Sequence, residues 1–360
     1  MAVTESGLAA RVSAYAAVGA RLSLLSDRRL EDAVSAAPSL GSGIGGRSAE
    51  LEVDGMRVFV KRVPLTDIEL QSEHVRSTTN VFDLPLYYQY GVGSAGFGAW
   101  RELAAHIMTT AWVLRNECAD FPLLYHWRVL PDSPPAGFVD ELGGVEGAVA
   151  HWEGSSAVRR RLEAIGRSSF SLVLFLEHVP QTLAEWLGDR SNAAPPEPGS
   201  ESPYRWVENA LLQGTEFMSA RGMVHFDAHF ANLLTDGQRV YFADFGLTLS
   251  REFELSMEER DFLADHLVYD RSYAPSHLLR HHLPDDVRGG TEHGAFLRAW
   301  VDGHQPAVVP PDIAAIIDRH APHAIVLDDF HHRLLTQSKR TPFPANEVKR
   351  ALASATTTEE

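Results

Sequence analysis

The sequence has almost no cysteine, since Cys118 is the only one among 360 residues. An internal disulfide and a metal site of the C-x-x-C type are therefore excluded, and a reducing cytoplasmic location is expected. The chain also lacks a signal-like start and any apolar run near the ~18 residues that a membrane span needs. Basic residues are few, with 32 Lys and Arg against 48 Asp and Glu and a net charge of −16. A nucleic-acid partner is not expected, because phosphate backbones require clustered positive charge.

Apart from these deficits the composition is that of a globular protein, with 44% hydrophobic and 22% charged residues. The 17 histidines include the adjacent pairs His281-His282 and His331-His332. No H-E-x-x-H motif and no cysteine partner accompanies them, so we interpret them as core or surface residues rather than metal ligands.

The most informative stretch is His225-Phe-Asp-Ala-His-Phe-Ala-Asn232, followed by Asp244-Phe-Gly246. Residues 204–220 before it have helical apolar spacing and end at Arg221-Gly222. After it, two short β-rich runs, 232–235 and 239–243, flank the turn signal Asp236-Gly237. This spacing predicts a base and two metal ligands in one cleft, which is typical of phosphoryl transfer.

The pattern H-x-D-x-x-x-x-N followed by D-F-G resembles the catalytic and metal-binding loops of the protein-kinase-like superfamily, which includes antibiotic and choline kinases. The resemblance implies an α+β fold of two lobes, a small β-rich N-lobe and a larger, mainly helical C-lobe. It implies that Asp227 accepts the proton of the acceptor hydroxyl, and that Asn232 and Asp244 hold the Mg²⁺ ions that bridge the phosphates of ATP. His225 would brace the loop. His229 stands where aminoglycoside- and choline-kinase-like enzymes carry histidine, and it therefore favours the atypical branch.

The amino-terminal half supplies independent parts. Gly41, Gly43 and Gly46 form a G-x-G-x-x-G pattern, and residues 48–53 and 56–63 are predicted strands around the turn Asp54-Gly55. Glycines let the backbone approach phosphates closely, and Lys61, at the end of Val-Phe-Val-Lys, is placed to reach the non-transferred phosphates. A dinucleotide site would want a strand before the glycines and a helix after them, so the order here favours the kinase interpretation.

The partner of Lys61 is open at this point. Glu102 lies on a long helical pattern and is the first choice, whereas Glu69 and Glu73 match the usual family spacing better. With Glu102, residues 64–99 form an insertion that contains Tyr87, Tyr88 and Tyr90. These tyrosines either bind the acceptor or pack the insertion onto the small lobe.

Residues 170–176 form an apolar run of strand length, followed by Glu177-His-Val-Pro-Gln and a helix from about Thr182. The resemblance implies that backbone groups of Glu177 and Val179 bind the adenine edge. After Gly246 no A-P-E segment follows; instead a Ser-x-x-Glu capping box at Ser256 opens a helix over 256–267. Phosphorylation-gated activation is therefore not expected. Asp261 on this helix either braces the catalytic loop or is a solvated helix residue.

We expect four parts: an N-terminal helical extension of two short helices (1–38), a nucleotide-covering N-lobe (39–176), a catalytic and acceptor-binding C-lobe (177–345) and a tail (346–360). Two polar loops are expected at 131–147 and 189–202. The predicted function is ATP- and Mg²⁺-dependent transfer of the γ-phosphoryl group to a hydroxyl, with Ser or Thr of a protein or precursor peptide slightly favoured. An antibiotic-type small-molecule kinase and an ATP-binding pseudokinase scaffold are the alternatives, and the oligomeric state stays open.

Overall fold

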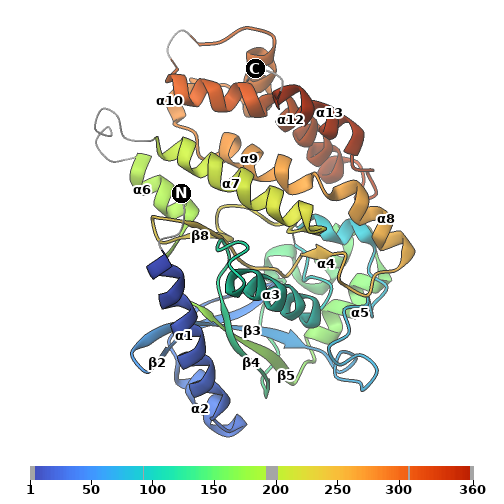
Figure 1. Cartoon of the computed structure of the whole chain (residues 1–360). Coiled ribbons are helices and arrows are strands. Elements are labelled where there is room, and N and C mark those ends of the chain that lie inside the picture. Colours follow the sequence, from blue (N-terminus) through green and yellow to red (C-terminus); the bar gives the residue numbers. More distant parts are fainter. Residues whose placement is uncertain (1–4, 92, 192–201, 307–308, 357–360) are drawn as a thin grey trace. The chain divides into compact units, whose positions relative to one another are not determined.

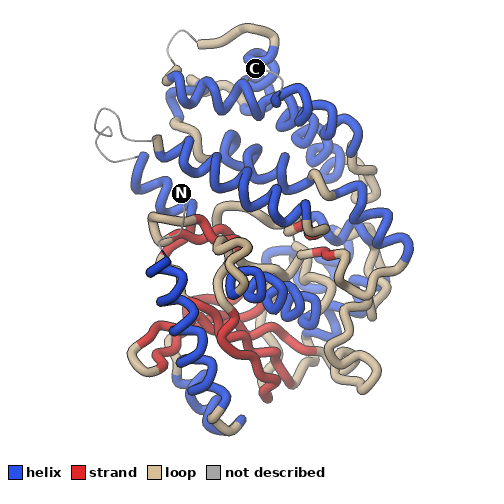
Figure 2. Tube along the Cα trace, in the orientation of Figure 1, coloured by secondary structure: helices blue, strands red, loops and turns tan. Residues whose placement is uncertain are grey.

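The computed structural model describes residues 5–91, 93–191, 202–306 and 309–356. The chain divides into two compact units, unit 1 (Met1–Val179 and Ala243–Glu259) and unit 2 (Pro180–Phe242 and Arg260–Glu360). It is α+β, with a five-stranded antiparallel sheet in unit 1 and a mainly helical unit 2 (Figures 1 and 2). Residues 5–38 and 243–259 thus belong to the same unit as the sheet.

The sheet of unit 1 has the order β1-β2-β3-β5-β4. The β2–β3 hairpin turns at Asp54 and Gly55, whose φ angles of 49° and 81° are both positive. A two-residue turn of this kind matches the twist of the strands it joins, so the predicted hairpin is confirmed. The strands of the sheet are β1 (Ser39–Gly43), β2 (Gly46–Val53), β3 (Met56–Leu65), β4 (Leu124–Pro131) and β5 (Phe170–Glu177).

One face of the sheet is covered by helix α3 (Ala99–Leu114). Alternate residues of β5, Leu172, Leu174 and Leu176, share a buried cluster with Trp100 and Leu103 of α3. This spacing of two is the pattern of a strand that presents one face to a helix. Helices α1 (Glu5–Ser23) and α2 (Asp27–Ala36) pack against β4, and Figure 1 shows α1 running beside the sheet.

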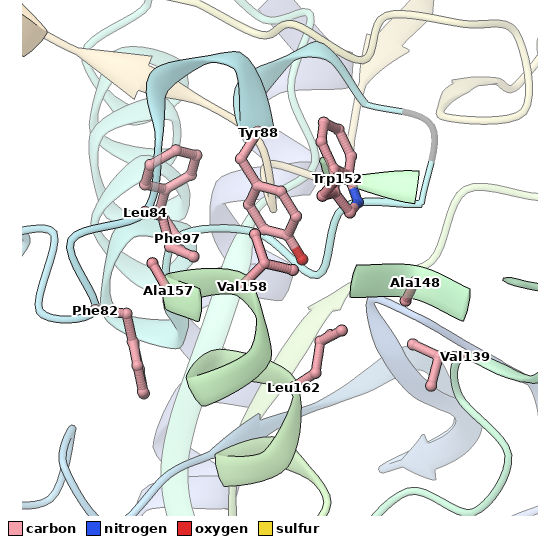
Figure 3. Packing of buried hydrophobic residues seen from close by; sticks show 10 residues of the cluster. All are labelled: Phe82, Leu84, Tyr88, Phe97, Val139, Ala148, Trp152, Ala157, Val158 and Leu162. Carbon is pink, nitrogen blue, oxygen red and sulfur yellow. The ribbon is translucent and has the colours of Figure 1, made fainter. Parts of the chain in front are cut away.

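Two inserted segments of unit 1 share a second hydrophobic core. One joins β3 to α3 (residues 66–98), and the other joins β4 to β5 (residues 132–169). Figure 3 shows the ring of Tyr88 beside Trp152, with Phe97 nearby. The centroids of the Tyr88 and Trp152 rings are 4.7 Å apart. We call these two segments the inserted module. Its elements are η1 (Leu86–Tyr90), η2 (Asp140–Leu142), α4 (Gly144–His151) and α5 (Ser156–Ile165).

The tyrosines of the inserted module are packing residues. Tyr88 is fully buried, Tyr90 is buried, and Tyr87 stacks on Trp152 at 6.2 Å. The hydroxyl of Tyr88 accepts the backbone N–H of Ala95 at 2.9 Å. Of the two alternatives for these tyrosines, packing describes Tyr88 and Tyr90, while Tyr87 is partly buried against Trp152.

Unit 2 is built around the long helix α12 (Pro311–Thr336), which packs against α7, α9, α11 and α13. A buried chain of polar side chains links three of these helices. Glu208 of α7 accepts from His320 of α12 at 2.6 Å, and His323 of α12 contacts Ser272 of α9 at 3.1 Å. The helices of unit 2 are α6 (Leu183–Ser191), α7 (Pro203–Ala220), α9 (Tyr269–His281), α10 (Asp285–Arg288), α11 (His293–Val301), α12 and α13 (Ala345–Thr356), while α8 (Met257–His266) begins in unit 1.

The short strands of unit 2 are β6 (Gln181–Thr182), β7 (Met223–Val224), β8 (Leu233–Thr235) and β9 (Val240–Phe242), and β10 (Leu249–Ser250) belongs to unit 1. The predicted β8–β9 hairpin is confirmed, with Gly237 at a φ of 81° in its turn. Close packing of α7 on this hairpin requires a glycine, because a Cβ on Gly214 would lie 2.0 Å from the ring of Phe242.

Three local predictions need correction. Residues 131–147, expected to be a loop, contain η2 and the start of α4. The predicted tail (346–360) lies in helix α13 as far as Thr356. The first N-terminal helix, expected to be short, has 19 residues. Most of the predicted loop 189–202 lies outside the described residues.

Within the described residues no single helix has the length and apolar character of a membrane span, and α1 with α2 meets that test only as a pair bent by 113°.

Candidate functional site

Lys61 of β3 and Glu102 of α3 form an ion pair inside unit 1. The Lys61 Nζ atom lies 2.7 Å from Glu102 Oε1 and 2.8 Å from Asp244 Oδ1. Lys61 is 8% exposed and Glu102 is 2% exposed, whereas the Asp244 side chain is 40% exposed. We call these three residues the lysine cluster. One cation thus lies between a buried carboxylate and an accessible one.

The charges of the lysine cluster depend on one another. Burial by itself lowers the pKa of Lys61, but the carboxylates of Asp244 and Glu102 outweigh it and raise this pKa above its ordinary value. Burial raises the pKa of Glu102, Asp244 adds to that rise, and Lys61 opposes it. Lys61 therefore stays protonated at neutral pH.

Of the three glutamates considered for Lys61, the structure brings only Glu102 to it. Glu69 is buried elsewhere, where its carboxylate accepts the N–H of Ala99 at 2.8 Å and pairs with Arg161 at 2.7 Å. It thus lies at the N-terminus of α3, where a helix favours negative charge. Glu73 is exposed and accepts from Ser72.

Asp244 lies in a constrained turn next to the buried Phe245. Asp244 has a φ of 60°, which is uncommon for a residue other than glycine. Its Oδ1 atom accepts the N–H of Gly246 at 3.3 Å in addition to Lys61. Phe245 is fully buried and its ring lies 4.9 Å from that of His106 on α3. The buried ring therefore anchors the turn that presents the Asp244 carboxylate.

The glycine-rich segment is the β1–β2 hairpin, in which Gly43 pairs with Gly46. A Cβ on Gly45 would lie 3.7 Å from Lys61 Nζ, so the tip of this hairpin passes over the lysine. Gly46 has a φ of 125°, and a Cβ there would meet the carbonyl oxygen of Arg62 at 2.3 Å. Gly41 and Gly43 lie in strand β1 and are exposed. The predicted G-x-G-x-x-G motif therefore did not include Gly45, whose backbone approaches Lys61. The adjacent pair Gly45-Gly46 at the hairpin tip could have indicated it.

Glu177, at the end of β5, is clamped by the N-terminal helix. Arg11 of α1 binds the two oxygens of Glu177 at 2.8 and 2.7 Å and also donates to the carbonyls of Ala119 and Phe121. The N–H of Glu177 donates to Leu123 O at 2.8 Å. That N–H is therefore engaged within the protein. Val179 is partly buried at the end of this part of unit 1.

In unit 2, residues 225–232, which we call the aspartate loop, hold Asp227 and Asn232 together. The Asn232 Nδ2 atom donates to Asp227 Oδ2 at 2.9 Å and to the Asp227 carbonyl at 3.1 Å. The N–H of Asp227 donates to His225 Nδ1 at 3.3 Å, and His225 is fully buried. These bonds fix the loop from inside, in agreement with the bracing role expected of His225.

Asp270 of α9 is a residue that sequence reasoning missed. Its carboxylate accepts the N–H of His225 at 2.5 Å and that of Phe226 at 3.0 Å. Phe226 has a φ of 65°, and its buried ring packs 5.1 Å from that of Tyr269. The bond from its N–H to Asp270 and the packing of its ring together hold this strained conformation. Burial raises the pKa of Asp270 to about 7, against the two N–H bonds, which lower it. Asp261, the residue considered for this brace, is exposed.

His229 lies beside Asp227, with 3.6 Å between its Nε2 atom and Asp227 Oδ1. Its ring is 6.1 Å from that of His277, which lies 5.1 Å from His282. Burial first, then the neighbouring histidines, lower the pKa of His277 to about 3. The described residues contain no group of three or more His, Cys, Asp or Glu arranged to hold a metal ion.

The donor atoms at the two predicted metal ligands fit Mg²⁺. The amide nitrogen of Asn232 is used by Asp227, which leaves its oxygen as the ligand atom. Asp244 offers a carboxylate that is accessible to solvent. Oxygen ligands of this kind, few in number, suit an ion that keeps waters and binds substrate phosphates as well.

Comparisons with protein-family models and with curated proteins find no match for this chain.

Proposed function

We propose that this protein is a phosphotransferase that moves the γ-phosphoryl group of ATP to a hydroxyl, with Mg²⁺ as cofactor. The observation that carries the proposal is the lysine cluster under the glycine hairpin. A buried lysine is held between a buried and an accessible carboxylate, and the backbone at Gly45 passes close to it. Positioning and neutralising phosphates needs a fixed cation next to backbone without side chains.

Each residue then has a defined task. Lys61 binds the non-transferred phosphates, and Glu102 orients it. Asp244 and Asn232 are the candidate ligands of Mg²⁺, which neutralises phosphate charge when bound. Asp227 accepts the proton of the attacking hydroxyl, and Asn232 orients its carboxylate through the bond at 2.9 Å. His225 and Asp270 hold the loop and do not touch the substrate.

Two substitutions separate binding from transfer. Asp227→Ala is expected to leave Mg-ATP affinity within about twofold of the parent and to lower kcat by about 10²–10⁴, because a base acts only during transfer. Asp244→Ala is expected to weaken Mg-ATP binding itself. Asp261→Ala, an exposed aspartate, is the control and should change neither. Calorimetry in which Asp244→Ala binds Mg-ATP like the parent would falsify the metal assignment.

The acceptor has two candidate classes. We place Ser or Thr of a polypeptide first, although the buried tyrosines of the inserted module remove one argument for it. A small-molecule hydroxyl is favoured by His229, whose ring lies beside Asp227 at 3.6 Å. Incubation of source lysate with γ-labelled ATP distinguishes them: label retained on polypeptide supports the first class, and label found only in small molecules supports the second. No turnover with either, despite Mg-ATP binding, supports a pseudokinase scaffold.

A further inference from the structure

The segment that follows Asp244-Phe-Gly246 is attached to the inserted module at several points within unit 1. Gln89 is 1% exposed, and its Nε2 atom donates to the Leu247 carbonyl. At Gly96 the backbone runs so close that a Cβ would lie 2.5 Å from the Gly246 carbonyl oxygen. The segment comprises residues 247–259, and these buried contacts fix its start.

The middle of the segment is attached through Glu254. Glu254 accepts from the Ser77 hydroxyl and from the N–H of Thr78 at 3.0 Å, and the N–H of Glu254 donates to Thr78 Oγ1 at 2.8 Å. These bonds join two stretches 176 residues apart in sequence. The end is attached through Arg101 of α3, which is 2% exposed and donates to Glu259 at 2.6 Å and to the Thr78 carbonyl at 2.7 Å.

The inserted module is itself rigidly built. Its ten-residue buried core (Figure 3) is supplemented by the buried ion pair between Glu69 and Arg161, in which each side chain is 2% exposed. Glu69 also bonds the first residue of α3, the helix that carries Glu102. A Cβ on Gly98 would come within 2.9 Å of that carboxylate, so glycine permits the approach. The same module thus supports both α3 and residues 247–259.

The hydroxyls of residues 247–259 are poor sites for a regulatory phosphate. Thr248 and Ser250 are 2% and 1% exposed. Ser256 is exposed, but its Oγ atom accepts the N–H of Glu259 at 3.1 Å in the capping box, and Glu259 in turn pairs with Arg101. A phosphate of nearly two negative charges at any of these hydroxyls would break contacts rather than make them.

We propose that the inserted module and the start of helix α3 together form a permanent clamp, in which Gln89, Thr78 and Arg101 are positioning residues. They hold residues 247–259 and so keep Asp244 at Lys61 without any covalent modification. This inference rests on the proposed function, whose site it explains. These residues touch neither nucleotide nor acceptor, and they act through the position of the Asp244 carboxylate.

The clamp is tested with Glu254→Ala and Gln89→Leu, with Glu252→Ala as the matched control. Glu252 is an exposed glutamate of the same segment, and its side chain pairs with that of the exposed neighbour Arg251. In hydrogen exchange without nucleotide, the amides of 247–259 should be protected in the parent and in Glu252→Ala. They should exchange at least tenfold faster in Glu254→Ala. Because Glu254 is a surface residue, this variant tests the clamp even if Gln89→Leu fails to fold.

Kinetics supply the second readout. The Mg²⁺ concentration that gives half-maximal activity should rise at least threefold in Glu254→Ala, and saturating Mg²⁺ should restore kcat, because the variant misplaces a metal ligand. A loss of kcat that is equal at all Mg²⁺ concentrations would indicate a merely structural role and overturn the assignment. Phosphatase treatment of the parent should leave kcat unchanged.

The outcomes separate the two proposals. If the amides of 247–259 are protected but the protein transfers no phosphate, the proposed function is contradicted and the clamp is supported. Rapid exchange of 247–259 in an active parent, or loss of activity on phosphatase treatment, would overturn the clamp and leave the function intact.

Discussion

Replacing Lys61 with methionine is expected to destabilise unit 1 as well as to abolish phosphoryl transfer. The methionine fills most of the space of the lysine but leaves the carboxylate of Glu102, which is 2% exposed, without its cation. Removing one partner of a buried ion pair typically costs about 3–5 kcal/mol. The lysine therefore stabilises the fold in addition to its proposed role at the nucleotide, and the single substitution alone does not distinguish the two.

The pH dependence of this cost follows from protonation of Glu102. The carboxyl can avoid the unpaired charge by taking up a proton, which costs about 1.4 kcal/mol for each unit by which the pH exceeds its ordinary pKa. That pKa is 4.5. The cost of Lys61→Met is thus limited to about 5 kcal/mol at pH 8 and about 1.4 kcal/mol at pH 5.5. Lys61 lowers the pKa of Glu102 in the parent, so its removal raises that pKa further in the folded variant, and the loss of stability grows as the pH rises above 4.5.

The assay is urea unfolding followed by circular dichroism at pH 5.5 and pH 8. Lys61→Met should lose markedly more unfolding free energy at the higher pH, relative to the parent at the same pH. Lys61→Met combined with Glu102→Gln should recover most of the stability at pH 8 and none of the activity. Equal loss at both pH values, or no recovery in the double variant, would refute a buried Glu102 paired with Lys61.

Three further substitutions test other parts of the structure. Asp270→Asn should lower kcat by about 10–100-fold with little change in the KM for ATP, because one of two N–H bonds to the aspartate loop is lost; an unchanged kcat would show that Asp270 does not hold the loop. Burial lowers the pKa of His266 to about 4, so between pH 6.5 and pH 4 the unfolded chain binds a proton at this residue that the folded chain does not bind. The free energy of unfolding therefore falls by about 1.4 kcal/mol for each pH unit below 6.5. His266→Leu should reduce the acid dependence of the melting temperature. Arg11→Met should raise the KM for ATP several-fold through Glu177 while Arg21→Met, on the same helix with an exposed partner at 3.6 Å, should not; equal behaviour of the two variants would exclude a specific role for Arg11.

Much of the local structure could be predicted from the sequence because its causes are local. The turn Asp54-Gly55 specifies a hairpin through the positive φ angles of both residues, and in the turn Asp236-Gly237 the positive φ is that of Gly237. The capping box at Ser256 forms as its spacing predicts, with Ser256 N donating to Glu259 at 2.9 Å. Helix α7 matches the predicted bounds to within a residue. In each case the signal and its structural consequence lie within a few residues.

The pairing of side chains across long sequence separations could not be read in this way. Spacing left three glutamates open for Lys61, and only the packing of α3 on β3 and β5 brings Glu102 to it and moves Glu69 to the helix N-terminus. The brace at Asp270 depends on where α9 passes behind the aspartate loop, 45 residues further along the chain.

The sequence by itself therefore determined which residue types stand in the chemical motifs and how each short element folds. The tertiary structure decided which charges meet and which side chains are buried. Tyr88 shows the difference: its sequence neighbours suggest a binding surface, yet the partner that buries it, Trp152, comes from a segment that only the fold brings close. Burial and charge pairing are properties of spatial neighbours, and spatial neighbours distant in sequence leave no periodic trace along a single chain.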